Sequence, residues 1–365
     1  NATLKNKPMP ENSNSQGTQA DGWSIRNDLA LIQHQTAPLW HSLQNAHLFI
    51  TGGTGFIGRW LLEALHHANR ELQLDLTITL LSRSPESFKK KCPHLCLGWR
   101  LNLIAGDVNA HLPAANYTHL IHAATDASAD LNEHQPLSVF KTVVHGTENI
   151  LELARHLPDS RTLFLSSGAV YGQQPDALEL ISESWNGSPD PQSPRNAYAE
   201  AKRAAEMLCA IYHKQFAVNV TSARIFSLLG PFLPLDIHFA AGNFIRDAMA
   251  GQPVIVNGNG LPVRSYLYPA DLIICLLHLL THGKPGSAYN VGSERSISIG
   301  ELAKTIAELV GDGRYEIRGA ADRGWNNGRY VPDTRRLRDE FGLSEYTSLE
   351  TAILNTSLAA KPHNL

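Results

Sequence analysis

The chain has 365 residues, 43% of them hydrophobic, and a formal net charge of -3 at pH 7. That hydrophobic content supports a sizeable core, and the near balance of 31 basic and 34 acidic residues gives no reason to expect nucleic acid or an anionic membrane as a partner. Four cysteines make no disulfide framework, no apolar run is long enough to span a bilayer, and no secretory pattern opens the chain, so we expect a cytoplasmic protein.

The N-terminal region divides into two parts. Residues 1–22 are rich in Asn, Ser, Gln, Pro and Gly and predict a flexible tail, because such a composition buries little apolar surface. Residues 23–46 carry apolar side chains at helical spacing, and Pro38 is expected to split this helical pattern into two pieces. We expect these residues to form a helical cap on the main domain.

A glycine-rich turn follows the first expected strand, which covers residues 47–52. The sequence Thr51-Gly-Gly-Thr-Gly-Phe-Ile-Gly58 leads directly into a helical pattern. Its glycines suit a tight turn, a close approach of ligand to backbone, and close packing of helix on strand. The free N–H groups and positive dipole end of the helix would bind a pyrophosphate. The residues expected to contact a dinucleotide here are Gly52, Gly55, Phe56, Ile57 and Gly58.

The end of the second expected strand, residues 75–82, bears on the choice of cofactor. In NAD-binding doubly wound folds an acidic side chain at this point holds the ribose 2′-hydroxyl. Ser82 occupies that place here and Arg83 follows it, and a guanidinium would pair with a 2′-phosphate. The cofactor is therefore NAD(P), and Arg83 favours NADP. The alternative is that Arg83 stacks on adenine or faces solvent.

Further strand ends add cofactor contacts. After a strand at 100–104, Asp107 would accept the adenine amino group, with Val108 beside it. After a strand at 119–122, Ala123 and Ala124 leave room for the cofactor. Alternating strands and helices predict an α/β fold, a Rossmann-type doubly wound parallel sheet covered on both faces. The motif at residues 92–96 holds two cysteines and a histidine, but no second cluster completes a metal site.

The catalytic chemistry centres on Tyr198 and Lys202, which share a helix face because they are four residues apart. A tyrosine is a poor base because its ordinary pKa is near ~10, and an adjacent ammonium is expected to lower it. Such a pair makes a general base for an alcohol that gives its hydride to nicotinamide, and the lysine also holds the ribose hydroxyls. Ser167, just past the fifth strand at 162–165, can hydrogen-bond the reacting oxygen.

These motifs resemble the extended short-chain dehydrogenase/reductase family, specifically its nucleotide-sugar epimerase/dehydratase branch, from about Leu48 to Asp333. In the C-terminal part of that span, the resemblance covers Asn243-Phe-Ile245, Arg264-Ser-Tyr266, and Arg323 with Tyr330. It implies a nucleotide-diphosphate sugar bound between the Rossmann domain and a smaller C-terminal domain. The residues that would hold the substrate are Ser167, Asn243, Arg264 and Arg323, the last three at the diphosphate.

Departures from the branch narrow the reaction. In sugar 4,6-dehydratases an Asp and a Glu occupy the two positions after residue 167, and nucleotide-glucuronate decarboxylases use a Glu at the second. Gly168 and Ala169 stand there instead, and neither moves a proton. We therefore expect a 4-epimerase with a transient 4-keto intermediate, with an NADPH-dependent 4-ketoreductase as the alternative. A dehydratase that uses Asp236 or His238, and a non-catalytic dinucleotide-binding regulator, are less favoured.

The domain expectation follows from these assignments. A Rossmann domain is expected over 47–225, with a substrate loop at 173–196, and a mixed α/β substrate-binding domain mainly over 226–365, interleaved with the first. The helix that carries Tyr198 and the helix that ends near His156 commonly pair in dimers of the family, so a homodimer is expected.

Overall fold

The computed structural model describes residues 22–125, 129–236, 240–319 and 328–361. The expected N-terminal tail, apart from its final residue, and Arg323 lie outside these ranges. The N-terminal segment forms helix α1 (Ile25–Gln35) and the 3-10 helix η1 (Ala37–Leu43), with Pro38 in the first turn of η1. The split expected at this proline is confirmed.

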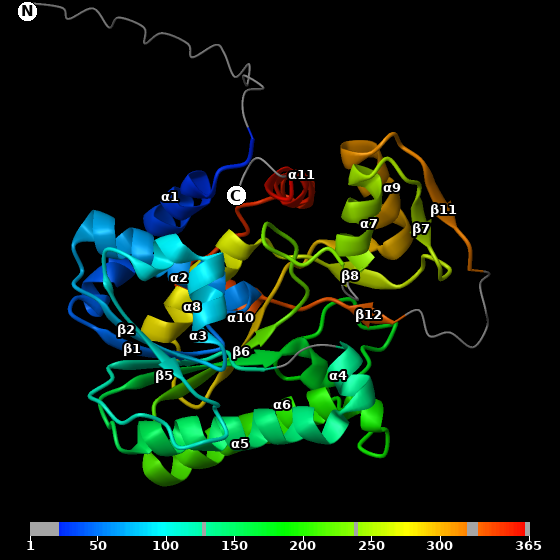
Figure 1. Cartoon of the computed structure of the whole chain (residues 1–365). Coiled ribbons are helices and arrows are strands. Elements are labelled where there is room, and N and C mark those ends of the chain that lie inside the picture. Colours follow the sequence, from blue (N-terminus) through cyan, green and yellow to red (C-terminus); the bar gives the residue numbers. More distant parts are fainter. Residues whose placement is uncertain (1–21, 126–128, 237–239, 320–327, 362–365) are drawn as a thin grey trace, which may run out of the picture.

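Within the described residues, a 7-stranded sheet in the order β3-β2-β1-β4-β5-β6-β9 forms the centre of the molecule (Figure 1). Every neighbouring pair in it is parallel. The order reverses at β1, so the carboxyl ends of β1 and β4 form the point where doubly wound folds bind ligands. The strands are β1 (His47–Thr51), β2 (Thr77–Ser82), β3 (Arg100–Ala105), β4 (His119–His122), β5 (Arg161–Ser167), β6 (Val220–Ile225) and β9 (Ala288–Val291).

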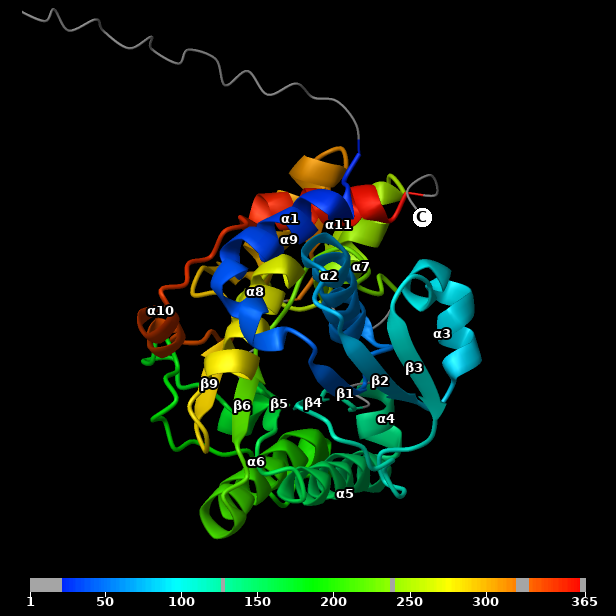
Figure 2. The ribbon, with the colours of Figure 1, turned by 90° about the vertical axis from the view of Figure 1, so that its left-hand side faces the viewer.

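Helices cover both faces of this sheet, as Figure 2 shows, and the alternation of side chains along β1 explains why. Leu48 and Ile50 pack in one core with helices α1, α2 and α8, whereas Phe49 points to the opposite core beside α5 and α6. The predicted α/β doubly wound architecture is confirmed. The remaining main-domain helices are α2 (Phe56–Leu72), α3 (Pro85–Lys91), α4 (Ala129–His134), α5 (Pro136–Arg155), α6 (Ala197–Phe216), α8 (Pro269–His282), and the 3-10 helices η2 (Pro93–Cys96), η3 (Gly168–Tyr171) and η4 (Pro194–Asn196).

A smaller mixed α/β region lies beside the carboxyl edge of the sheet (Figure 1). A capping box is present, because Ser298 and Glu301 bond each other's backbone N–H at the start of α9. The elements of this region are α7 (Ala240–Met249), α9 (Ile299–Val310), and strands β7 (Val254–Val256), β8 (Val263–Ser265), β10 (Ser296–Ser298), β11 (Tyr315–Ile317) and β12 (Arg329–Tyr330). The exact domain limits stay a prediction.

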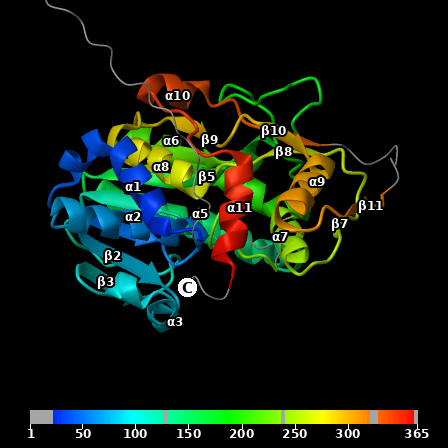
Figure 3. The same cartoon turned by 90° about the horizontal axis from the view of Figure 1, so that it is seen from above.

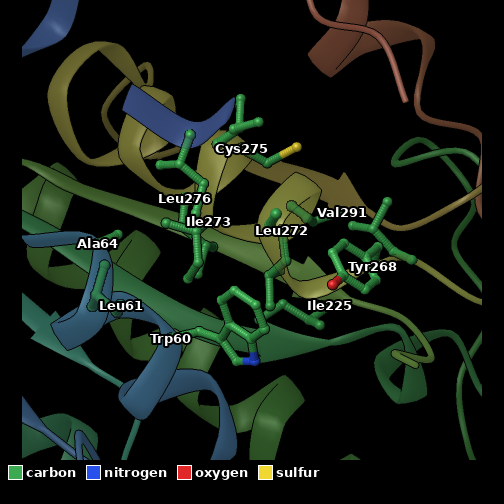
Figure 4. Packing of buried hydrophobic residues seen from close by; sticks show 14 of the residues in the cluster. Trp60, Leu61, Ala64, Ile225, Tyr268, Leu272, Ile273, Cys275, Leu276 and Val291 are labelled. Carbon is green, nitrogen blue, oxygen red and sulfur yellow. The ribbon is translucent and has the colours of Figure 1, made fainter. Parts of the chain in front are cut away.

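The two C-terminal helices pack on different parts of the molecule. Helix α10 (Arg335–Phe341) packs on β9, and α11 (Leu349–Ala359) lies against α7 and α9, as seen from above in Figure 3. The core that joins α2 to α8 is drawn in Figure 4, where Trp60 on α2 faces Leu272 and Tyr268. This packing fixes the helix that follows the glycine turn.

Both ends of the described chain meet at Tyr268. Its hydroxyl donates to the buried Asp28 carboxylate of α1 at 2.8 Å and accepts from Asn355 of α11 at 3.1 Å. Trp23 also donates to Asp28, at 2.7 Å. Burial raises the pKa of Asp28, and these two donated bonds oppose the rise.

In the described part of the chain, no helix combines the length and the apolar character that crossing a membrane requires. No three His, Cys, Asp or Glu side chains among the same residues are grouped as metal ligands. The histidine of the candidate half-site, His94, instead lies 2.9 Å from Glu63.

Candidate active site

The turn between β1 and α2 can be built only with glycine at two of its positions. Gly52 has a φ of +72°, and a Cβ added there would lie 2.4 Å from the carbonyl carbon of Ala123. A Cβ at Gly58 would lie 2.3 Å from the Cα of Gly53. The β1 turn therefore touches the backbone that follows β4, and α2 starts directly against the turn.

The start of α2 fits a dinucleotide diphosphate. The first helical hydrogen bond in the turn runs from the Arg59 N–H to the Gly55 carbonyl at 2.8 Å. The N–H groups of Phe56, Ile57 and Gly58 precede it and have no partner within the helix. Gly55, the N-cap, has no side chain to cover them. The structure thus leaves these donors and the positive helix end available for an anion.

The residues expected at the adenosine end lie on neighbouring strand ends. Ser82 is buried at the end of β2, where its hydroxyl accepts the Ser84 N–H at 3.1 Å, and Arg83 is exposed. Beyond β3, the Asp107 carboxylate accepts the Asn109 N–H at 2.8 Å, and Val108 is buried in the core. Because β1, β2 and β3 are adjacent, these groups share one edge of the sheet with the glycine turn.

The three expected catalytic side chains are brought together between α6 and the end of β5. Lys202 is buried, and its Nζ donates to the Leu165 carbonyl at 2.6 Å and to the Thr125 hydroxyl at 2.8 Å. The same nitrogen lies 5.9 Å from the centroid of the Tyr198 ring. Ser167, the last residue of β5, lies close enough to lower the pKa of Tyr198.

Burial has the largest effect on the pKa values of Tyr198 and Lys202. Burial raises the pKa of Tyr198, and the neighbouring Ser167 side chain lowers it by less. Burial also lowers the pKa of Lys202 to about 7, although the Glu206 carboxylate one turn later favours the ammonium. The expectation that Lys202 lowers the pKa of Tyr198 below its ordinary value is therefore wrong for the polypeptide by itself. Moving the phenolate out of water raises its free energy by more than the neighbouring groups lower it.

An ion pair whose side chains are only 16% and 14% exposed supports the floor of the site. Glu206 accepts the Ser166 hydroxyl at 2.5 Å and pairs with Arg224 of β6 at 2.6 Å. Arg224 also donates to the Tyr171 hydroxyl at 2.7 Å, and that hydroxyl donates to Asn290 of β9 at 2.7 Å. The segment after β5 is thus tied to α6, β6 and β9.

Replacing Arg224 with alanine is expected to lower the free energy of unfolding by about 3 kcal/mol, because it leaves the mostly buried Glu206 carboxylate without its partner. Urea denaturation followed by circular dichroism measures the loss. Arg318→Ala is the matched control, since Arg318 and Glu316 form an ion pair in which both side chains are 55% exposed. The control is expected to cost less than about 1 kcal/mol. Equal losses in the two variants would contradict the supporting role.

Of the three residues expected at the substrate diphosphate, two lie within the described part of the chain. Arg264 of β8 is half-buried and donates to the Gly328 carbonyl at 2.6 Å, and its strand pairs with β12 so that Arg264 lies opposite Tyr330. Asn243 lies on α7, where its side-chain oxygen accepts from Arg246 at 3.1 Å. Arg323 lies outside the described residues. The proposed contacts of all three with a diphosphate stay a prediction.

Two side chains near this cluster were not assigned from the sequence. Thr125 accepts from Lys202 and directly follows Ala123 and Ala124, so its place after a strand end was a usable signal. The Tyr330 hydroxyl lies 2.6 Å from the position that a Cβ on Gly168 would take, yet Tyr330 comes from a distant two-residue strand. No local pattern in the sequence shows that β12 reaches the end of β5.

Comparisons with known proteins agree with this geometry. Residues 48–292 match the model of the NAD dependent epimerase/dehydratase family. The chain is 32% identical over 266 residues to UDP-glucuronic acid decarboxylase 3 of Arabidopsis thaliana, covering 73% of this chain and 75% of that protein. It is 31% identical over 309 residues to UDP-glucuronic acid decarboxylase 1 of Xenopus tropicalis, covering 85% of this chain and 70% of that protein.

Solved structures support the fold. A UDP-glucose 4-epimerase from Thermotoga maritima superposes with a TM-score of 0.72 at 20% identity, covering 86% of this chain and 98% of that one. A dTDP-glucose 4,6-dehydratase from Bacillus anthracis, solved with NAD, gives 0.71 at 19% identity, covering 86% and 95%. From its sheet order, its glycine turn and the matched sequence, the chain belongs to the NAD-dependent epimerase/dehydratase family of enzymes, within the extended short-chain dehydrogenases/reductases.

Proposed function

We propose that this protein oxidises the C4 hydroxyl of a nucleotide-diphosphate sugar, with Tyr198 as the base. The observation that supports it is the cluster of Ser167, Tyr198 and Lys202 at the same sheet edge as the glycine turn. The relatives named as acting on UDP-glucuronic acid support a sugar nucleotide as the substrate class.

Three side chains of the protein have separate roles in the proposed oxidation. Tyr198 takes the proton of the sugar hydroxyl, Ser167 hydrogen-bonds the reacting oxygen, and Lys202 stabilises the phenolate and holds ribose hydroxyls. When bound, oxidised nicotinamide supplies a hydride acceptor and a positive charge. Burial raises the pKa of Tyr198, so that positive charge would favour the phenolate.

A 4-epimerase is the reaction that we favour, with a 4-ketoreductase as its alternative. Gly168 and Ala169 carry no group that could give or take a proton, so elimination of a C6 hydroxyl lacks its acid and base. Asp236 is described and exposed, whereas His238 lies outside the described residues. A dehydratase that uses this loop therefore stays the weaker proposal, as does a non-catalytic regulator.

Decarboxylation is a second candidate, favoured by the 32% identity to a UDP-glucuronic acid decarboxylase. Oxidation at C4 turns a uronic acid into a β-keto acid, which loses carbon dioxide when the ketone oxygen accepts the electron pair of the broken bond. Ser167 and Tyr198 are placed to hydrogen-bond that oxygen. The same C4 oxidation thus precedes both reactions, but Ala169 stands where nucleotide-glucuronate decarboxylases use a Glu, so decarboxylation ranks second.

The deciding experiment has two stages. Chromatography of the nucleotides released from purified protein first shows whether it retains NAD or NADP, which also tests the preference inferred from Arg83. The protein is then incubated with NAD and either UDP-glucose or UDP-glucuronic acid, and products are identified by NMR. Retained NAD and an inverted C4 support the epimerase, and release of carbon dioxide supports the decarboxylase. An empty protein that oxidises NADPH with a 4-keto sugar nucleotide supports the reductase.

We also propose a cytoplasmic homodimer formed through α5 and α6. These helices lie side by side on the outer face of one helical layer (Figure 2). They expose large apolar side chains there, namely Leu137, Phe140, Met207 and Ile211. The four cysteines are free, which suits a reducing compartment.

A further inference from the structure

A tight turn after β6 holds a phenylalanine at a position that favours glycine. The Leu233 N–H donates to the Gly230 carbonyl at 3.2 Å, which closes a turn with Pro231 second and Phe232 third. Phe232 has a φ of +71°, a left-handed backbone that is unfavourable for a bulky L-residue. Proline second and a positive φ third match a type II turn, in which glycine or asparagine usually takes the third position. Contacts of the Phe232 side chain must therefore offset the strain.

Those contacts come from the first turn of α2 and from the N-terminal segment. The Arg59 guanidinium lies over the Phe232 ring, with its Cζ 3.4 Å from the ring centroid. The ring centroids of Trp23 and Trp60 lie 5.5 and 5.6 Å from that of Phe232. The Trp60 indole N–H also donates to the Pro231 carbonyl at 3.0 Å. Helix α2 thus holds the backbone of the turn as well as its aromatic side chain.

Arg59 connects this turn to the dinucleotide site. Its backbone N–H makes the first helical hydrogen bond of α2, directly after the N–H groups that are available for an anion. Its Nε is buried without a hydrogen-bond partner among the described residues, and the Glu63 carboxylate lies 3.7 Å from it. The face of the Phe232 ring is therefore a main contact of the guanidinium. A ligand that orders the start of α2 acts on the residue that covers Phe232.

The segment that follows the turn rests against α7. A Cβ added to Gly242, in the first turn of α7, would lie 3.1 Å from the Pro234 carbonyl oxygen. Arg246 of the same helix donates to the Leu235 carbonyl at 3.4 Å and to the Asn243 side chain at 3.1 Å. The turn is thus in contact with the start of α2 and leads into residues that contact α7.

We propose that Phe232 is a positioning residue that couples the dinucleotide site to the sugar-nucleotide site. Cofactor bound at the glycine turn fixes the start of α2, the Arg59 guanidinium then holds the Phe232 ring, and the turn in its strained form holds the first turn of α7. A turn that is unfavourable by itself keeps its shape only while its side chain is covered. The proposal rests on the proposed function for the role of Asn243 at the substrate diphosphate.

Hydrogen exchange read by mass spectrometry tests this coupling. Protein freed of bound nucleotide is compared with protein saturated with NAD⁺ or NADP⁺, whichever it binds more tightly. In the wild-type protein the cofactor is expected to slow amide exchange in α7 by about tenfold, within the usual range of coupling between sites. Phe232→Leu and Arg59→Met each remove one side of the stack, so the slowing is expected to fall below about twofold while calorimetry still shows cofactor binding.

Phe216→Leu is the matched control, because it removes a stack of the same kind at the C-terminal ends of α5 and α6, where Arg155 lies 4.0 Å from the Phe216 ring centroid. It is expected to leave the slowing in α7 intact, as is Phe232→Tyr, which keeps the ring. Equal slowing in the wild type and in both stack variants, or none in the wild type, would overturn the proposal.

The exchange measurement uses no sugar nucleotide, so it separates the coupling from the proposed function. Slowing that depends on Phe232, in a protein that converts no sugar nucleotide, would contradict the proposed function and support the coupling. Turnover of a sugar nucleotide by a protein in which the cofactor leaves α7 exchange unchanged would support the proposed function and contradict the coupling.

Discussion

Phenylalanine in place of Tyr198 is expected to slow turnover by about a thousandfold, within the range of a lost general base. The ring is kept, so the half-buried aromatic surface between α6 and Ser167 is preserved and only the hydroxyl is removed. Binding of the cofactor to the glycine turn and to Lys202 is expected to be unchanged. Steady-state rates with the substrate found above, together with NAD binding by calorimetry, measure the two effects.

The same helix offers a control for this substitution. The Tyr212 hydroxyl donates to Glu152 at 3.1 Å on the surface of the α5 and α6 layer, away from Ser167. Tyr212→Phe is expected to retain full turnover. A Tyr198→Phe variant that turns over at the normal rate would remove the base from the mechanism, and one that keeps a full biological effect without turnover would support the regulator.

Alanine at Gly52 is expected to lower the free energy of unfolding by about 3 kcal/mol and to abolish measurable NAD binding. The left-handed backbone, with a φ of +72°, accounts for only part of the cost. The larger part arises because the new methyl would lie 2.4 Å from the Ala123 backbone, which relaxes only if β1 and β4 move apart. Urea denaturation and NAD titration measure the two losses.

Gly98 separates the two causes. It has a φ of +80°, and a Cβ added there has no neighbouring atom within 4 Å. Gly98→Ala therefore isolates the left-handed strain, with an expected cost of about 1 kcal/mol and unchanged NAD binding. Equal losses of stability in Gly52→Ala and Gly98→Ala would show that the contact between the β1 and β4 turns is not the reason that residue 52 must be glycine.

The central sheet was largely predictable because each of its main strands is a short apolar run followed by turn residues. His119–His122 was predicted with the limits that the structure gives, and the β1 and β2 predictions differ from the structure by one and two residues. Strand β9 was not predicted, because four residues without a clear alternation carry little signal. It forms a sheet edge only because β6 offers it a partner.

The candidate site was likewise predictable only in part from the sequence. Tyr198, Lys202 and the glycine turn carry local spacing rules, so the sequence alone brings them into one hypothesis. Tyr330 carries none, since its position depends on the pairing of β12 with β8. For the polypeptide without its cofactor, the pKa of Tyr198 is raised and not lowered, because the sequence shows which charges are near but not how deeply a hydroxyl is buried.

The contacts of Tyr268 bear on how the protein can be truncated for expression. One phenol fastens the first helix to the last, through Asp28 on one side and Asn355 on the other. The stretch that matches the family model, residues 48–292, contains the phenol but neither of its partners. A recombinant fragment trimmed to that stretch would lose α1 and α11 and expose the surface of α8 that they cover, so we expect the stable folding unit to be longer than the stretch that matches the family model.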